Sequence, residues 1–264
     1  MTRPTDAASH TPESGGNVAI DPAGASTPRK LFGYDVLHYL GDGAGTRIYA
    51  VKDPVTGRSY ALKHVVRTTD EDARFVEQME NEYEVSRQLS HPGLRRAVAF
   101  KTRKTLLFKT AEAALVMELF DGESLDRKLP RSDAALVACF VDTAKALYAL
   151  HHAGFVHCDL KPANILCGPT GTIQVIDLGQ ACPIGTVKKR IQGTPDYLSP
   201  EQFELKPVTE RTDAFNLGAT MYWALCGQKL PTAYTVVLSV ETARPRTSLL
   251  KPGFQLFSAP VVMS

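Results

Sequence analysis

The sequence has little excess charge of either sign, few cysteines and no long apolar run. Among its 264 residues, 30 lysines and arginines face 28 aspartates and glutamates, so the formal net charge is only +2. A protein that binds nucleic acid through phosphate groups needs a concentrated basic face, and we therefore expect no nucleic-acid partner. No apolar run approaches the roughly 20 residues that span a bilayer, and we expect no membrane segment in this chain.

The cysteines and the N-terminus indicate the compartment. There are five cysteines, an odd number, and none belongs to a C-x-x-C pair. Thr, Asp, Ser and Pro occupy the N-terminus, where a signal peptide would have its apolar segment. Scattered, unpaired cysteines are typical of a reducing compartment, so we expect a cytoplasmic protein.

The two ends of the chain differ from its middle. Residues 1–30 contain four prolines and no aromatic residue, a composition that predicts a disordered N-terminal tail. Residues 228–264 contain four more prolines, and we expect an atypical C-terminal segment there.

Residues 31–120 carry short runs of β-branched and aromatic residues, separated by turns that contain glycine. The runs are LFGYDVLHYL, RIYAVKD, SYALKHVV, KTLLFKT and ALVMELF, and each predicts an antiparallel strand. Between the third and fourth runs, apolar residues at helical spacing predict a helix over about residues 70–89. This part of the chain is therefore expected to be β-rich, with one helix.

The chain changes character at about Asp121. Ser132 is the predicted N-cap of a long helix that ends near Gly154, and a last helix is predicted over about residues 213–225, closed by Gly227. Short apolar runs at FVH, NIL and TIQVID alternate with polar loops between these helices. We expect an α+β fold, in which a small antiparallel β-rich part precedes a larger, mainly helical part.

Residues 40–48 form a glycine-rich turn between two predicted strands. Gly41, Gly43 and Gly45 let the backbone approach a phosphate group closely. A strand rather than a helix follows the turn, which disfavours a dinucleotide site. From these residues alone, a phosphate-binding loop and a flexible hairpin turn are equally good interpretations.

Lys63 on the third predicted strand and Glu82 on the predicted helix are a candidate ion pair. A lysine beside the glycine-rich turn can project its ammonium toward phosphates held under that turn, and Glu82 can reach inward to it. Each residue taken alone is more often a solvated surface charge, so the pairing depends on the neighbouring motifs.

The most informative segment is VHCDLKPANIL, residues 156–166. It places Asp159, Lys161 and Asn164 between two apolar anchors. An aspartate can accept the proton of an attacking hydroxyl, a lysine can neutralise a transferring phosphoryl group, and an asparagine can bind magnesium. Asp177 follows at the end of a predicted strand, and its carboxylate is a ligand of the kind that Mg²⁺ prefers.

Taken in order, these residues resemble the signature set of the eukaryotic-type protein kinase family. The resemblance runs from about Tyr34 to Gly227 and includes further matches at residues 193–201 and 213–218. It implies a two-lobed kinase domain over residues 31–227, with an N-lobe over about 31–120 and a C-lobe over about 121–227. It also implies ATP as cofactor, together with Mg²⁺ or Mn²⁺.

The resemblance implies a role for each site residue. The catalytic residues would be Asp159, Lys161, Lys63, Glu82 and Thr194, and the metal ligands would be Asn164 and Asp177. Met117 would be the gatekeeper of the adenine pocket. The residues implied to contact the nucleotide are Leu40, Gly41, Asp42, Gly43, Ala44, Gly45, Thr46, Ile48, Ala61, Lys63, Met117, Glu118, Phe120 and Leu166.

Two residues resemble the serine/threonine branch of the family. Lys161 follows Asp159 by two residues, and Thr194 lies in the Gly193-Thr194-Pro195 turn. The resemblance therefore implies transfer of the γ-phosphoryl group of Mg-ATP to serine or threonine hydroxyls of protein substrates.

Three positions depart from the family pattern. Cys158 stands where the family has an arginine, so no guanidinium is available there to bind a phosphorylated activation segment, and we expect activity not to require that phosphorylation. Thr46 stands at the position of the third family glycine. Ser86 stands where the family usually buries an apolar side chain, which predicts looser positioning of the helix.

The C-lobe is expected to be truncated. Only 37 residues follow Gly227, whereas the family has several more helices there, including an arginine that pairs with the glutamate corresponding to Glu201. We therefore expect Glu201 without its usual partner and an exposed apolar underside on the last helix.

Two alternatives compete with catalysis. The shortened C-lobe and Cys158 favour a catalytically weak or inactive pseudokinase that acts as a nucleotide-binding scaffold or signalling module. A zinc site made of His157, Cys158 and Cys167 is the second alternative, although residues 159–164 already account for this stretch.

Overall fold

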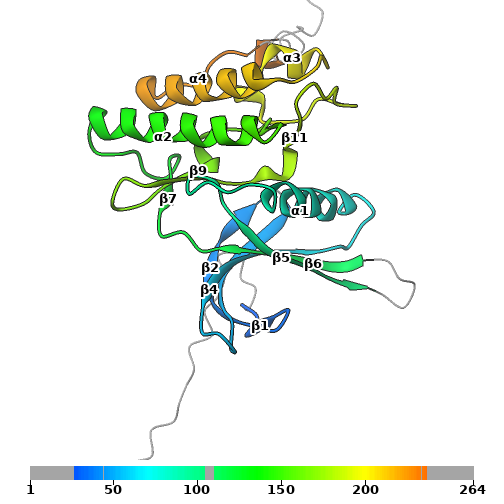
Figure 1. Cartoon of the computed structure of the whole chain (residues 1–264). Coiled ribbons are helices and arrows are strands. Elements are labelled where there is room, and N and C mark those ends of the chain that lie inside the picture. The colour runs from blue at the N-terminus through cyan, green and yellow to red at the C-terminus, as the bar shows by residue number, and fades with distance from the viewer. Residues whose placement is uncertain (1–26, 44, 105–109, 233, 237–264) are drawn as a thin grey trace, which may run out of the picture.

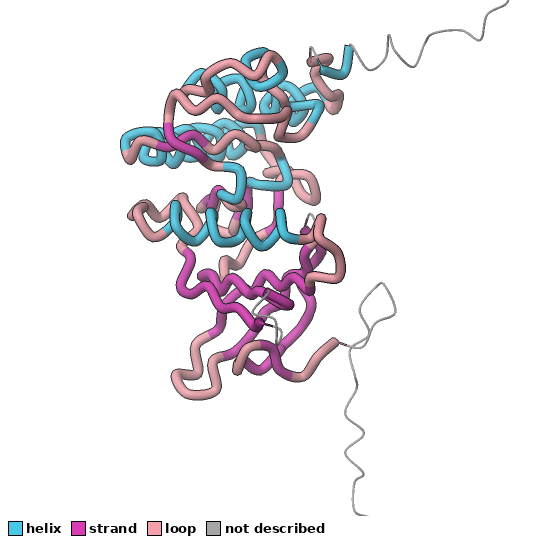
Figure 2. The backbone as a smooth tube through the Cα atoms, turned by 90° about the vertical axis from the view of Figure 1, so that its right-hand side faces the viewer, coloured by secondary structure: helices cyan, strands magenta, loops and turns pink. Residues whose placement is uncertain are grey.

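The computed structural model describes residues 27–43, 45–104, 110–232 and 234–236. The strands of a large sheet gather at one end and the two long helices at the other, with helix α1 (Ala73–Ser86) between them (Figure 1, Figure 2). The predicted tail, residues 1–30, and the C-terminal segment, residues 228–264, lie largely outside the described residues.

A six-stranded antiparallel sheet forms the β-rich part, in the order β1-β2-β3-β4-β6-β5. Successive residues of a strand point to opposite faces, and both faces of the central strands are buried. Leu62 and Val116 belong to one apolar cluster, whereas Ala61 and Met117 belong to another. The strands are β1 (Lys30–Leu31), β2 (Tyr34–Gly43), β3 (Thr46–Lys52), β4 (Ser59–Val66), β5 (Ala97–Lys104) and β6 (Thr110–Glu118).

Helix α1 packs against one face of this sheet. Met79, Glu82, Val85 and Ser86 are its buried residues, and their spacing of three or four places them on one side of the helix. The hydroxyl of Ser86 donates to Arg95 O at 3.0 Å and accepts from Ala97 N at 2.7 Å. Ser86 thus attaches α1 to the start of β5, so our expectation of a loosely positioned helix is not supported.

Strand β5 differs from the strand predicted in its place. It covers Ala97–Lys104, whereas the predicted run KTLLFKT begins at Lys104, and residues 105–109 lie outside the described residues. The sequence AVAFKTRK was missed because three of its eight residues are basic. Its position at the edge of the sheet leaves these side chains partly or fully exposed, as is common for edge strands.

The helical part contains the long helices α2 (Asp133–His152) and α4 (Glu210–Cys226) and the short helix α3 (Pro200–Phe203). The hydroxyl of Ser132 caps α2 by accepting from Ala135 N. Helix α4 begins three residues earlier than predicted, because Thr209 and Thr212 form a capping box. It ends at Gly227, which has the left-handed φ of 68° that favours glycine.

Short strands between α2 and α4 position two polar stretches of chain, residues 157–164 (the central loop) and residues 177–201 (the long segment). Strand β9 (Ile165–Cys167) pairs with β7 (Glu123–Ser124) and with β10 (Ile173–Val175). Strand β8 (Phe155–Val156) pairs with β11 (Cys182–Pro183). The second pairing holds the start of the long segment beside the strand that leads into the central loop.

Helix α2 is the one helix among the described residues that is long and apolar enough to cross a membrane by length and composition. We had expected no such run. Its residues Leu136, Phe140, Leu147 and Leu150 are buried in the main cluster of the helical part. Because a core helix passes the same test, length and composition do not assign α2 to a membrane.

Helix α4 has an exposed apolar face within the described part of the chain. The exposed fraction is 64% for Leu225 and 37% for each of Met221 and Tyr222. This agrees with the exposed apolar underside that we expect for the last helix. Among the described residues, the helical part contains only α2, α3 and α4 as α-helices. In Figure 1, α2 and α4 lie side by side, and α2 packs against the small strands β8 and β10.

Candidate active site

A cavity of about 580 Å³ lies where the sheet, helix α1, the central loop and the long segment meet. All of the residues predicted to be catalytic or metal-binding line it, together with four further residues predicted to contact nucleotide. The predicted residues in its wall are Asp42, Gly43, Ile48, Lys63, Glu82, Met117, Asp159, Lys161, Asn164, Asp177 and Thr194.

Lys63 forms two ion pairs at this cavity. Its Nζ lies 2.9 Å from Glu82 Oε2 and 2.9 Å from Asp177 Oδ1. Ala61, Lys63 and Val65 share the face of the sheet that α1 covers, and Glu82 lies on the buried side of α1. The pair of Lys63 with Glu82 was a candidate from the sequence, whereas the second pair, with Asp177, was not foreseen.

The three charges shift one another's pKa. Burial lowers the pKa of Lys63, but the carboxylates of Asp177 and Glu82 outweigh burial and raise that pKa above its ordinary value. Burial acts to raise the pKa of Asp177, yet the Lys63 ammonium dominates and lowers it to about 2. Burial raises the pKa of Glu82, and the nearby Asp177 carboxylate adds to this rise. Lys63 and Asp177 are therefore both charged at neutral pH.

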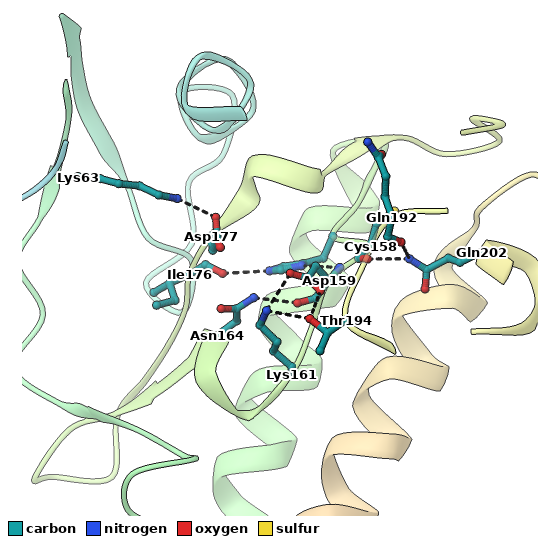
Figure 3. A network of polar contacts seen from close by, with 11 residues as sticks. Lys63, Cys158, Asp159, Lys161, Asn164, Ile176, Asp177, Gln192, Thr194 and Gln202 are labelled. Atoms are coloured by element: carbon teal, nitrogen blue, oxygen red, sulfur yellow. Dashed lines mark hydrogen bonds and ion pairs between the residues drawn. The ribbon is translucent and has the colours of Figure 1, made fainter. Parts of the chain in front are cut away.

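Asp159 is held by a small network on the opposite side of the cavity (Figure 3). Thr194 Oγ1 donates to Asp159 Oδ1 at 2.8 Å, and Lys161 Nζ lies 3.2 Å from Asp159 Oδ2. Lys161 Nζ also donates to Thr194 Oγ1 at 2.8 Å. The side chains of Asp159, Lys161 and Thr194 thus form a closed triangle, which fixes the direction of the Asp159 carboxylate.

Asn164 and Asp177 fit the demands of a divalent cation such as Mg²⁺. Asn164 is buried, and its Nδ2 donates to Asp159 O at 2.8 Å. Within the described residues its carbonyl oxygen Oδ1 has no hydrogen-bond donor, and neither has Asp177 Oδ2. These two free oxygen atoms line the same cavity and are hard ligands of the kind that Mg²⁺ or Mn²⁺ takes.

The backbone of the central loop is anchored by Asp213, the fourth residue of α4. Asp213 is fully buried, and its Oδ2 and Oδ1 accept from the backbone N–H groups of His157 and Cys158 at 2.8 and 2.9 Å. His151 Nε2 lies 2.7 Å from Asp213 Oδ2. The sequence placed Asp213 within a matched stretch but gave it no role, because the two loop residues lie more than 50 positions earlier.

Gln202 in α3 holds the same loop from another side. Its Nε2 donates to Cys158 O at 2.7 Å and to Gln192 O at 3.2 Å. It therefore joins the central loop to the long segment, as Figure 3 shows. Nothing in the sequence around Gln202 distinguished it from a surface glutamine.

Asn81 connects helix α1 to the turn that follows Asp177. Its Nδ2 lies within hydrogen-bond distance of three backbone carbonyl oxygens, those of Leu178, Gly179 and Ala181, at 3.3, 3.2 and 2.9 Å. Asp177 itself has a left-handed φ of 66°, which is uncommon for a residue other than glycine. The contacts from Asn81 hold this unusual turn in place.

The other described residues that were predicted to contact nucleotide do not line this cavity. Gly45 and Thr46 line a second cavity of about 710 Å³, and Asp42 and Gly43 line it as well. Ala61 is buried opposite Met117 in the pairing of β4 with β6. Ala44 lies outside the described residues. The other residues predicted to contact nucleotide that are absent from the wall of the main cavity are Leu40, Gly41, Glu118, Phe120 and Leu166.

Three charged residues of the cavity wall were not anticipated, Arg74, Arg95 and Arg190, and of these only Arg95 is buried. Arg95 lines the cavity, is buried, and donates from Nε to Gln174 Oε1 at 3.1 Å. Burial lowers the pKa of Arg95 to about 10, and the carboxylate of Glu82 counteracts part of this effect. Arg95 therefore adds a second buried positive charge behind the pair of Lys63 with Glu82.

The departures from the family pattern have specific surroundings. Cys158 is buried, has a left-handed φ of 65°, and its sulfur contacts the sulfur of Cys182. Glu201 has no ion pair within the described residues, but its Oε1 accepts from Thr212 Oγ1 at 2.6 Å. Thr46 is buried at the base of the glycine-rich turn.

The residues of the alternative zinc site do not converge. His157 Nε2 lies 3.1 Å from Ile176 O, and His157 Nδ1 accepts from Asp159 N. Cys167 contacts Cys139. No group of three potential metal-ligating His, Cys, Asp or Glu side chains occurs in the described ranges, so the geometry does not support that alternative.

Comparison with known proteins extends the resemblance over most of the chain. A model described as "Protein kinase domain" matches residues 34–242. The chain is 31% identical over 206 residues to the "Probable serine/threonine-protein kinase PknB" of Corynebacterium glutamicum, a match that covers 74% of this chain and 31% of that protein. It is 30% identical over 205 residues to the "Serine/threonine-protein kinase PknA" of Mycobacterium tuberculosis, which covers 74% of this chain and 47% of that protein.

A third relative has a comparable similarity. The chain is 32% identical over 195 residues to "Serine/threonine-protein kinase 36" of Pongo abelii, a match that covers 72% of this chain and 14% of that protein. The aligned region thus spans less than half the length of each of these relatives. With a domain match over most of its length and these similarities, the chain belongs to the protein kinase family.

Proposed function

We propose that the chain is a serine/threonine protein kinase that transfers the γ-phosphoryl group of Mg-ATP to hydroxyl groups of protein substrates in the cytoplasm. The observation that carries this proposal is the complete set of polar groups around one cavity. Lys63, paired with Glu82 and Asp177, forms one side, and Asp159, held by Lys161 and Thr194, forms the other.

Each group has a definite task in this reaction. The Asp159 carboxylate accepts a hydrogen bond from the substrate hydroxyl and takes its proton as the hydroxyl oxygen attacks the γ-phosphorus. Lys161 places positive charge near the oxygens of the transferring group. Lys63 binds the α- and β-phosphates, and Glu82 keeps its ammonium in position.

Asn164 Oδ1 and Asp177 Oδ2 are the atoms that would hold the cation. When bound, Mg²⁺ neutralises phosphate charge and stabilises the charge that develops during transfer. The pKa of Asp177 is low because of Lys63, so this ligand is anionic throughout the neutral pH range without a proton having to leave it.

The serine/threonine assignment rests on the contact between Lys161 and Thr194. Their hydrogen bond of 2.8 Å places both beside the Asp159 carboxylate. The similarity to relatives named as serine/threonine kinases supports the same assignment. We take residues 31–227 as the kinase domain, with the two lobes meeting near Asp121.

The test is transfer of labelled phosphate from Mg-ATP to a mixture of generic protein substrates. We expect transfer by the parent chain and a fall to background in Asp159→Asn and Asp177→Asn. Asp142→Asn is the matched control, because Asp142 is a partly exposed residue of α2 that pairs with Lys145. Equal transfer by the parent and the two site variants would contradict the assigned mechanism.

One observation favours a second candidate function, a nucleotide-binding scaffold. Leu225, Met221 and Tyr222 present an exposed apolar face on α4, a feature of protein-interaction surfaces. Nucleotide binding measured by a thermal shift with Mg-ATP, without transfer of labelled phosphate by the same sample, would favour the scaffold.

A further inference from the structure

Cys158 and Cys182 bring two sulfur atoms together at the junction of the central loop and the long segment. Their Sγ atoms lie 3.7 Å apart. The pairing of β8 with β11 sets this proximity, because Cys182 lies opposite Val156 and Cys158 follows Val156 by two residues. Both cysteines are buried in an apolar cluster with Val156 and Val208. The paired strands β8 and β11 hold the two sulfur atoms in van der Waals contact.

The two thiols differ in reactivity. The pKa of Cys182 is lowered to about 6, chiefly because its sulfur accepts a hydrogen bond from Cys158, with a further contribution from the positive charge of Lys188. The pKa of Cys158 is raised by the same hydrogen bond and by burial. The thiolate is the nucleophilic form of cysteine, so we assign the first reaction to Cys182, which Lys188 helps to ionise, and the second to Cys158.

We propose that Cys158 and Cys182 form an oxidative modification site that reacts with a hydroperoxide and closes an intramolecular disulfide between the central loop and the long segment. In the first step, the Cys182 thiolate attacks the terminal OH oxygen of the hydroperoxide, the O–O bond breaks, and the alkoxide or hydroxide that leaves takes a proton from water. Cys182 is then a sulfenic acid.

The second step uses the neighbouring thiol. The Cys158 sulfur attacks the Cys182 sulfur, the S–S bond forms, and the S–O bond breaks with release of water that takes the Cys158 proton. The two sulfur atoms together lose two electrons and the peroxide gains two. A dithiol reductant reverses the modification by exchange.

The disulfide has a consequence for the proposed kinase activity, on which this part of the inference rests. An S–S bond is about 2.05 Å long, so the sulfur atoms must approach by well over 1 Å. Cys158 cannot simply follow, because its N–H is held by Asp213 and its carbonyl by Gln202. Asp159 is the next residue, and a displacement of about 1 Å at a reacting group lowers a rate by about 100-fold. Oxidation is therefore expected to inhibit transfer reversibly.

The chain contains a second cysteine pair that serves as an internal comparison. Cys139 Sγ and Cys167 Sγ lie 3.2 Å apart and join α2 to β9. Neither residue belongs to the central loop or the long segment. The variant Cys167→Ser removes this pair without touching the residues assigned to the reaction, and Cys182→Ala removes the proposed one.

The chemical test maps the disulfide in the full chain. The reduced protein is treated with a small excess of hydrogen peroxide, its free thiols are alkylated, and the chain is cleaved before each aspartate. This cleavage places one cysteine in each of the peptides 133–141, 142–158, 159–176, 177–195 and 213–264. We expect peptides 142–158 and 177–195 to be joined, with the loss of two hydrogen atoms. Recovery of both as alkylated, sulfinic or differently joined peptides would overturn the proposal.

The functional test measures phosphate transfer before and after the same treatment. We expect a loss of at least about tenfold in the parent and in Cys167→Ser, recovery with dithiothreitol, and no loss in Cys182→Ala. If Cys182→Ala does not fold, as judged by its thermal melt, Cys158→Ala takes its place. A joined peptide pair without any loss of transfer would refute the inhibitory effect. If the reduced parent transfers no phosphate at all, the proposed function fails, while the peptide map still decides the modification site.

Discussion

The two sides of the cavity are held in place by different kinds of interaction. On the sheet side, Lys63 is fixed by opposite charges on Glu82 and Asp177. On the loop side, residues 157 and 158 are fixed by hydrogen bonds in which their N–H groups donate to Asp213 and the carbonyl of residue 158 accepts from Gln202. Loss of one charge on the sheet side should therefore affect chemistry more than folding, whereas loss of an anchor on the loop side should affect folding first.

The substitution Asp213→Ala should have the largest effect. It leaves the N–H groups of His157 and Cys158 buried without an acceptor, and it removes the partner of His151. We expect the free energy of unfolding to fall by about 3–5 kcal/mol, measured by denaturant unfolding. Asp213→Asn retains an acceptor oxygen and should lose less. A loss below about 1 kcal/mol for Asp213→Ala would show that the loop does not depend on α4.

The substitution Lys63→Met, on the sheet side of the cavity, should reduce phosphate transfer strongly while reducing stability only moderately. The substitution removes the positive charge from the cavity, and Glu82, whose pKa is already raised by burial, can then take up a proton. We expect phosphate transfer to fall by about 100-fold or more, with a smaller loss of stability than for Asp213→Ala. The matched control is Lys52→Met, at the exposed end of β3. Parental transfer by Lys63→Met would remove Lys63 from the mechanism.

The substitution Thr194→Val tests the triangle of side chains around Asp159, and its expected effect on transfer is smaller. Valine has the shape of threonine but neither accepts a hydrogen bond from Lys161 nor donates one to Asp159. Loss of about one hydrogen bond to a charged group should lower transfer by about tenfold. Thr194→Ser keeps the hydroxyl and should stay near the parental rate. Equal rates in the two variants would indicate that the hydroxyl has no part in orienting Asp159.

The pH dependence of stability should show the smallest effect. The pKa of Asp177 is about 2 in the folded chain against an ordinary value of 3.8, so its ion pair contributes stability above pH 4 that is lost as the pH falls from about 4 to 2. Because the side chain is 37% exposed, solvent screening reduces this contribution to about 1 kcal/mol. The measurement is the stability of the parent minus that of Asp177→Asn, at pH 6 and at pH 2.5. A difference that does not change with pH would contradict the ion pair.

Local sequence patterns predicted most of the helices and strands, because these elements are specified by residues that are close together in the chain. Strands β2, β3 and β4 and helix α2 follow from alternation, spacing and capping residues close together in the chain. Strand β5 was missed because its basic residues are tolerated only at the edge of the sheet, and an edge position depends on which strands pair.

The site was predicted in the same uneven way. Lys63, Glu82, Asp159, Lys161, Asn164 and Asp177 could be named because each lies in a short motif whose residue types suggest phosphate or metal chemistry. Asn81, Gln202 and Arg95 could not be named, because their roles consist of contacts with residues that are far away in the sequence. Supporting residues of this kind become visible only when the fold has brought the distant segments together.

Asn81 also links helix α1 to the turn after Asp177. Its side chain contacts three carbonyl groups of the turn after Asp177, so we expect α1 and this turn to move together. Any swing of α1 away from the sheet would withdraw Glu82 and Asp177 from Lys63 together. Opening and closing of the cavity would then be a single two-state step rather than two independent motions, and one side-chain amide would supply the mechanical link.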